Sequence, residues 1–159
     1  MEKIAFGGGC HWCTEAIFQN IKGVFQVEQG FVSSYGAAKE FSEAVIVHFD
    51  PAITGMQTLI KIHLHTHASS SNHSMRNKYR SAIYAFSKTQ ENEAGKILWV
   101  LRKEFKEELI TEVLAFRKFK RSDESYCDYY QNGPEKPFCK RFIEPKIEFL
   151  KLNFPKNLK

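Results

Sequence analysis

The sequence lacks several features that mark other classes of protein. No run approaches the roughly 20 apolar residues that a membrane-spanning helix needs. The first residues have neither the basic stretch nor the apolar core and cleavage site of a secretory signal peptide. Internal repeats and low-complexity segments are missing too. We therefore expect a cytoplasmic protein with no membrane contact, folded as one domain over residues 1–159, whose 43% hydrophobic residues fill a single core.

Cysteine is also scarce. The four cysteines, at positions 10, 13, 127 and 139, are too few and too uneven for the disulfide framework of a small secreted domain. In a reducing compartment such a set is more often catalytic or metal-binding. The sequence therefore favours redox chemistry at a thiol or a metal site, and both remain open at this point.

The net charge is a modest +5, and the basic residues are concentrated in the last quarter of the chain. A basic tail can meet nucleic acid, but no signature of a nucleic-acid-binding module accompanies these charges. We therefore interpret the tail as a solvated face and expect no nucleic-acid partner.

What the sequence does contain is a regular succession of strand and helix patterns. The expected strands cover residues 2–6, 24–31, 45–49, 79–86 and 111–116, and the expected helices cover residues 12–21, 54–64 and 87–105. Capping-box spacing marks the starts of the second and third helices, at Thr54 and Ser87. The order β-α-β-β-α-β, followed by an extra helix and strand, predicts a two-layer α+β fold, ferredoxin-like, with a wrapping C-terminal tail.

A cysteine lies at the junction between the expected first strand and the expected first helix. Gly7, Gly8 and Gly9 supply a backbone that can turn sharply and be approached closely, and Cys10 follows them directly. A thiol in this place faces unpaired backbone amides and the positive end of the helix dipole. Such a setting can lower the pKa of a cysteine from about 8.5 to roughly 3.5–7.5. Cys10 is therefore a candidate nucleophile.

The spacing of Cys10 and Cys13 serves dithiol exchange and zinc binding alike. Imidazoles could complete a zinc site, but alternate residues on a helix point about 200° apart, so His63, His65 and His67 cannot all face one ion. His63 and His67, four residues apart, share the apolar face of their helix. The pattern favours a core or functional role for these two histidines over metal ligation.

Two further residues are candidates for acid chemistry. Glu43 has the same parity as the apolar residues of the third strand, so its carboxyl group should face the core. A buried carboxylate without a partner costs several kcal/mol, so Glu43 must be neutral or paired, and it is a candidate proton donor. Tyr79, at the start of the fourth strand, could bring a hydroxyl to the same end of the sheet.

Four segments of the chain match the order of motifs in a known family. They are Gly8-Gly9-Cys10-His11-Trp12-Cys13, Ser42-Glu43-Ala44-Val45, Tyr79-Arg80-Ser81-Ala82-Ile83-Tyr84 and Pro137-Phe138-Cys139. These segments resemble peptide methionine sulfoxide reductase of type A, and the resemblance runs from near residue 4 to about residue 150. It implies the same two-layer α+β fold and a thiol-dependent reduction of methionine-S-sulfoxide, free or in proteins.

The resemblance also implies roles for individual residues. Cys10 would attack the sulfoxide sulfur, Glu43 would protonate the sulfoxide oxygen, and Tyr79 would donate a hydrogen bond to that oxygen. Trp12 would line an apolar pocket for the S-methyl group of the substrate. Methionine would then leave, and Cys10 would remain as a sulfenic acid.

A second thiol must resolve the sulfenic acid to a disulfide, and Cys13 and Cys139 are both candidates. Cys127 lies where the family has a polar residue, and we treat it as incidental. A thioredoxin-like reductant would restore the dithiol. The resemblance implies no metal and no organic cofactor, and we expect a monomer.

The chain departs from the family pattern close to the nucleophile. His11 replaces the family's phenylalanine, which makes one wall of the substrate pocket polar and could pair with the Cys10 thiolate. Tyr35 is the nearest candidate for a second tyrosine that faces the substrate, and the usual aspartate before Tyr79 is missing. A non-catalytic or zinc-holding binding module on the same scaffold is therefore the alternative to the enzyme.

Overall fold

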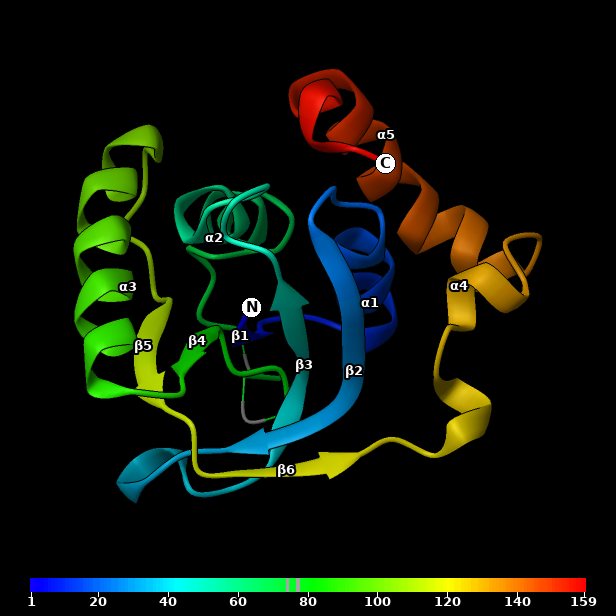
Figure 1. Cartoon of the computed structure of the whole chain (residues 1–159). Coiled ribbons are helices and arrows are strands. Elements are labelled where there is room, and N and C mark those ends of the chain that lie inside the picture. The colour runs from blue at the N-terminus through cyan, green and yellow to red at the C-terminus, as the bar shows by residue number, and fades with distance from the viewer. Residues whose placement is uncertain (74, 77) are drawn as a thin grey trace.

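A computed structural model describes residues 1–73, 75–76 and 78–159. Within these residues, six strands form one sheet in the order β5-β4-β1-β3-β2-β6 (Figure 1). The strands are β1 (Glu2–Gly7), β2 (Val24–Ser33), β3 (Ser42–Phe49), β4 (Ala82–Ala85), β5 (Glu112–Ala115) and β6 (Lys118–Arg121). Neighbouring strands are antiparallel except β4 and β5, which are parallel. The predicted order of the elements through β5 is therefore confirmed.

The first three helices lie where periodicity predicts them, with corrections at their ends, whereas the two helices of the C-terminal tail were not predicted. They are α1 (His11–Gln19), α2 (Met56–His65), α3 (Lys88–Leu101), α4 (Tyr129–Asn132) and α5 (Glu144–Asn153), with a π-helical turn at Cys139–Ile143 and 3-10 turns at Gly36–Ala38, Arg102–Glu104, Glu124–Tyr126 and Pro155–Asn157. Ser87 caps α3 as predicted, because its side chain accepts a hydrogen bond from the Gln90 amide. The predicted cap at Thr54 is wrong, since α2 begins after Gly55.

The start of the fourth strand and the presence of a sixth strand also differ from the prediction. The fourth strand begins at Ala82, so Tyr79 lies in the turn before it rather than in the sheet. The strand β6 was not predicted at all. Its sequence Lys118-Phe119-Lys120-Arg121 is charged and largely exposed, because it is an edge strand that pairs only with β2.

The two faces of the sheet carry different side chains because residues alternate along each strand. The larger hydrophobic cluster joins Ile4 and Phe6 of β1 and Val45 and Val47 of β3 to α1, α2 and α5. A smaller cluster on the opposite face contains Ala5 and its neighbours. Glu43 shares the parity of Val45, and its placement on the helix-covered face is confirmed.

The C-terminal tail wraps around α1. Figure 1 shows the orange and red segment, from α4 through α5, beside this helix. The tail contacts α1 through α4, the π-helical turn and α5, which confirms the predicted wrapping segment. In the described part of the chain, no helix has the length and apolar character required to cross a membrane.

Candidate active site around Cys10

Cys10 is the N-cap residue of α1. Its carbonyl oxygen accepts hydrogen bonds from the amides of Cys13, at 3.1 Å, and Thr14, at 3.2 Å. The glycine turn before it is required at Gly8, whose φ is +151° and whose position would bring a Cβ within 2.5 Å of the His67 ring. The turn thus places a half-buried thiol at the start of the helix, as the sequence predicts.

The surroundings of Cys10 stabilise its thiolate. A hydrogen bond from the Cys13 thiol is the largest contribution, and the His11 side chain and the Trp12 amide also act on the sulfur. Together they lower the pKa of Cys10 to about 4, although burial acts in the opposite direction. Cys10 is therefore a thiolate, the nucleophilic form of cysteine, at neutral pH.

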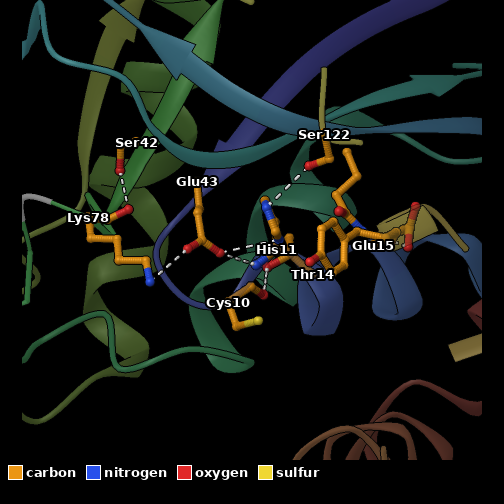
Figure 2. A network of polar contacts seen from close by, with 10 residues as sticks. Cys10, His11, Thr14, Glu15, Ser42, Glu43, Lys78 and Ser122 are labelled. Atoms are coloured by element: carbon orange, nitrogen blue, oxygen red, sulfur yellow. Dashed lines mark hydrogen bonds and ion pairs between the residues drawn. The ribbon is translucent and has the colours of Figure 1, made fainter. Parts of the chain in front are cut away.

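Glu43 is 5% exposed and has positively polarised partners on both sides. Its Oε1 accepts a hydrogen bond from the His11 amide at 3.2 Å and lies 3.2 Å from His11 Nδ1. Its Oε2 lies 3.6 Å from Lys78 Nζ. Figure 2 shows the carboxylate between these two residues. Of the two states expected for a buried Glu43, the structure shows the paired one.

The nucleophile and the carboxylate lie within reach of one small substrate. One ligand atom each from Cys10, His11 and Glu43 lies within 4.8 Å of the other two. The sulfur of a bound sulfoxide can therefore contact Cys10 Sγ while the sulfoxide oxygen contacts the Glu43 carboxyl group. The same three atom types also suit zinc.

His11 forms a polar link at the bottom of the site. Its Nε2 lies 3.3 Å from Ser122 Oγ, and its ring meets Phe31 edge-on at 5.3 Å between centroids. The imidazole thus connects Glu43 to Ser122 (Figure 2) and places a polar side chain next to the nucleophile.

Comparisons with known proteins agree with this geometry. The family model for peptide methionine sulfoxide reductase matches residues 2–158. The chain belongs to the peptide methionine sulfoxide reductase family. It is 28% identical to the enzyme MsrA of Sulfolobus acidocaldarius, with 98% of this chain and 96% of that protein covered. It is 30% identical to MsrA of Deinococcus radiodurans, with 94% and 81% covered. The chain is thus an oxidoreductase that reduces methionine sulfoxide.

Solved structures share the fold. Methionine sulfoxide reductase A of Corynebacterium diphtheriae matches with a TM-score of 0.73 at 21% identity, covering 84% of this chain and 75% of that chain. Reduced Mxr1 of Saccharomyces cerevisiae matches with a TM-score of 0.76 at 18% identity, covering 87% and 88%. The chain therefore has the mixed α+β architecture of this reductase family, with its curled sheet of six strands in the described residues.

The thiols of this reductase divide into two groups. Cys13 is buried beside Cys10, and the hydrogen bond to Cys10 raises its pKa, as does burial. Cys139 is fully buried in the same hydrophobic cluster as Cys13, on the π-helical turn that contacts α1. Cys127 instead lies near Asp123, with its sulfur 3.8 Å from that carbonyl oxygen. Both predicted resolving cysteines are thus on the α1 side of the structure.

Trp12 packs against the C-terminal tail. Its ring stacks on Tyr129 at 4.2 Å and on Tyr126 at 5.6 Å, and it meets Phe138 edge-on at 5.1 Å between centroids. These three partners come from the C-terminal tail. Trp12 therefore anchors the tail over the start of α1, and access to its face requires the tail aromatics to move.

The two candidate tyrosines lie in different places. Tyr79 follows Lys78, whose ammonium is 5.2 Å from the centre of the Tyr79 ring and also near Glu43. Tyr35 is 61% exposed, and its ring faces Arg117 at 6.0 Å. The described contacts thus bring Tyr79 to the site through Lys78 and do not bring Tyr35 there.

Sequence reasoning missed three residues around the site. Lys78 contacts Glu43 because Lys78 carbonyl oxygen accepts hydrogen bonds from the Glu43 amide, at 3.0 Å, and from Ser42 Oγ, at 2.9 Å, which ties the turn to β3. Ser122 follows the unpredicted strand β6. Glu15 is buried and accepts hydrogen bonds from the amides of Asp128 and Tyr129, which fixes the tail. Only Glu15 had a sequence signal, as a charged residue on the first helix.

Proposed function

We propose that the chain reduces the S epimer of methionine sulfoxide, free or in proteins, with Cys10 as nucleophile and Glu43 as acid. The observation that carries the proposal is the placement of a low-pKa thiolate and a buried carboxyl group within 4.8 Å of each other. Thiolate attack on sulfur and proton delivery to oxygen require this pair of groups.

The first step transfers oxygen from substrate to enzyme. The Cys10 thiolate bonds to the sulfoxide sulfur while Glu43, protonated from solvent before the reaction, gives its proton to the oxygen, and Tyr79 donates a hydrogen bond to the same oxygen. The hydroxyl group then passes from the substrate sulfur to the Cys10 sulfur as the S–O bond of the substrate and the transient S–S bond both break. Methionine leaves, and Cys10 becomes a sulfenic acid. His11 and Lys78, both in contact with Glu43, hold the carboxyl group at the reacting oxygen.

The second step makes a disulfide. Cys13 attacks the Cys10 sulfenic acid, and water leaves with the oxygen and the thiol proton. Cys13 is favoured because its thiol already contacts the Cys10 sulfur, whereas Cys139 lies deeper, at 0% exposure. A thioredoxin-like dithiol then reduces the disulfide. A structure of Mxr1 in complex with Trx2, which matches this chain with a TM-score of 0.64 at 17% identity, covering 79% of this chain and 83% of that chain, supports such a partner.

The proposed cycle uses only side chains, substrate and a dithiol, so it needs no metal and no organic cofactor. We place the protein in the cytoplasm because its four cysteines, all in the described part of the chain, are free thiols. We also propose that it acts as a monomer, as one domain, without a nucleic-acid partner. His11 is proposed to contact the substrate next to the reacting atoms, and Trp12 to do so once the tail aromatics move off its ring. The exposed Tyr35 is not given this role.

One assay separates this function from a zinc-holding module that would use Cys10, His11 and Glu43. The protein is incubated with a methionyl sulfoxide peptide and dithiothreitol, and methionine formation is compared for the wild type, Cys10→Ser and Glu43→Gln. The enzyme account expects turnover by the wild type and its loss in Cys10→Ser. Undiminished turnover by Cys10→Ser, or an inactive wild type with stoichiometric zinc, supports the alternative.

A further inference from the structure

A small cavity borders both thiols, and Glu43 is not among the residues that line it. Its volume is about 40 Å³, and its walls include Cys10, Cys13, His63, His67 and Lys146. A cavity needs about 10–15 Å³ of such volume and several polar partners to hold a water molecule. This cavity meets both conditions.

His63 presents an unused nitrogen in this region. The residue is 2% exposed, and its Nε2 lies 2.7 Å from the carbonyl oxygen of Gly7. A carbonyl oxygen can only accept, so Nε2 carries the hydrogen. Burial lowers the pKa of His63 well below its usual range, so the ring is neutral and Nδ1 is a bare acceptor. Among the described residues, Nδ1 has no hydrogen-bond partner.

His67 lines the same cavity but has no free nitrogen to offer. Its Nδ1 donates to the carbonyl oxygen of His63 at 2.5 Å, and its Nε2 accepts from Ser81 Oγ at 2.8 Å. Ser81 in turn lies 2.7 Å from Thr111 Oγ1. Of these two histidines, only His63 thus has a nitrogen free to accept a hydrogen bond from a water molecule in the cavity.

Lys146 brings a positive charge to the thiols from the first turn of α5. Its ammonium donates to the carbonyl oxygen of Thr66, which fixes it at the cavity wall. The hydrogen bond to Cys10 raises the pKa of Cys13, and the charge of Lys146 acts in the opposite direction. A developing Cys13 thiolate is therefore stabilised from this side.

We propose that a water molecule held in the cavity by a hydrogen bond to His63 Nδ1 relays the Cys13 proton to the leaving hydroxyl group of Cys10 during disulfide formation, while Lys146 stabilises the Cys13 thiolate. The Cys13 sulfur bonds to the Cys10 sulfur, the S–O bond of the sulfenic acid breaks, and the oxygen leaves as water with the proton that the relay water delivers. His63 acts through the water and is a positioning residue. The inference rests on the proposed function, because it assumes that Cys13 resolves Cys10.

The test uses His63→Gln, whose amide nitrogen can still donate to Gly7 but which has no second ring nitrogen to hold the water. The matched control is His67→Asn, on the same cavity, whose amide nitrogen can still donate to the His63 carbonyl oxygen. Each full-length protein is reduced, freed of reductant and mixed with an equimolar methionyl sulfoxide peptide. Quenched samples give methionine formed, sulfenic acid trapped by dimedone, and the Cys10–Cys13 disulfide measured by mass spectrometry.

In His63→Gln we expect methionine release within about twofold of the wild type, since the two steps are independent. Disulfide formation should slow by at least about tenfold, with sulfenic acid accumulating, because the water that relays the proton is no longer positioned. His67→Asn should retain both rates. Wild-type disulfide formation in His63→Gln overturns the proposal, and so does equal slowing of both steps, which indicates a purely structural role.

A second route to the sulfenic acid separates this inference from the proposed function. Hydrogen peroxide oxidises the Cys10 thiolate directly, without methionine sulfoxide. If the wild type forms its disulfide after peroxide, the comparison with His63→Gln holds even where the sulfoxide reaction fails. A wild-type disulfide from Cys10 to Cys139 overturns the role of His63, whichever oxidant is used.

Discussion

The two sides of the Cys10 sulfur are built from different groups. On one side, Glu43 is paired with His11 and Lys78, so a carboxyl group and cationic or N–H donors face the place of a substrate oxygen. On the other side, a thiol and neutral imidazoles surround a small cavity. The difference shows how one sulfur atom can first take oxygen from a substrate and then transfer its own oxidation to a second thiol.

The largest expected effect comes from replacing the nucleophile, on which both reaction steps depend. Replacing Cys10 by Ser exchanges the thiolate for a hydroxyl group that is not ionised at neutral pH. We expect Cys10→Ser to release no methionine above the background of the reductant alone, and to form no disulfide with peroxide. Methionine assays and thiol counts check both results. Retained turnover would mean that another residue is the nucleophile.

Glu43→Gln is expected to impair only the first step, the reaction with the sulfoxide substrate. The amide keeps the shape of the side chain but cannot deliver the proton, so methionine release should fall by about 100- to 10,000-fold. Disulfide formation after peroxide should stay within about twofold of the wild type, because Glu43 does not face the cavity. Rapid-quench measurements of methionine release and of disulfide formation test this expectation. An equal loss of methionine release and of disulfide formation would refute the assignment of Glu43 to the substrate reaction alone.

Cys13→Ala removes the hydrogen bond that stabilises the Cys10 thiolate. The rate of alkylation by iodoacetamide against pH should give an apparent pKa of about 4 for wild-type Cys10 and a clearly higher value in the variant. The folded-state pKa of Cys10 lies below that of the unfolded chain. The thiolate therefore contributes stability that is fully present above the unfolded pKa and is lost as the pH falls toward 4.

Urea unfolding at pH 8 and pH 5 checks the sign of this contribution. The wild type should lose more unfolding free energy between these values than Cys13→Ala does. An unchanged alkylation profile in the variant would show that Cys13 does not act on the Cys10 sulfur.

The smallest expected effect is that of Lys146→Met. The methionine preserves most of the apolar stem and removes the charge near Cys13. Disulfide formation should slow by about two- to fivefold, since a partly exposed charge contributes at most about 1 kcal/mol. Methionine release should not change. Lys151→Met, an exposed residue of the same helix, is the control and should leave both rates unchanged.

Much of the substrate side was predictable from the sequence. Strand parity placed Glu43 on the buried face, and the glycines before Cys10 predicted a thiol at a helix start, because both patterns follow from local geometry. Lys78 was not predictable, since its contact with Glu43 depends on how a turn docks on β3. The cap at Thr54 was wrong because Gly55 takes the N-cap position instead.

Less of the cavity side could be predicted. His63 was assigned to the apolar face of its helix, and the structure confirms that it is buried. Its free nitrogen depends on a hydrogen bond to Gly7, 56 residues away in the chain, which periodicity cannot show. Lys146 is one of many basic residues in the tail, and only the docking of α5 distinguishes it from the others.

The account depends most directly on where the oxidation of Cys10 goes after one turnover. The decisive measurement is peptide mapping by mass spectrometry of the reduced wild type after reaction with one equivalent of methionyl sulfoxide peptide, without reductant. The account predicts one methionine formed for each chain and a disulfide between Cys10 and Cys13. A chain that forms no methionine, or a disulfide that joins Cys10 to Cys139 or Cys127, would contradict it.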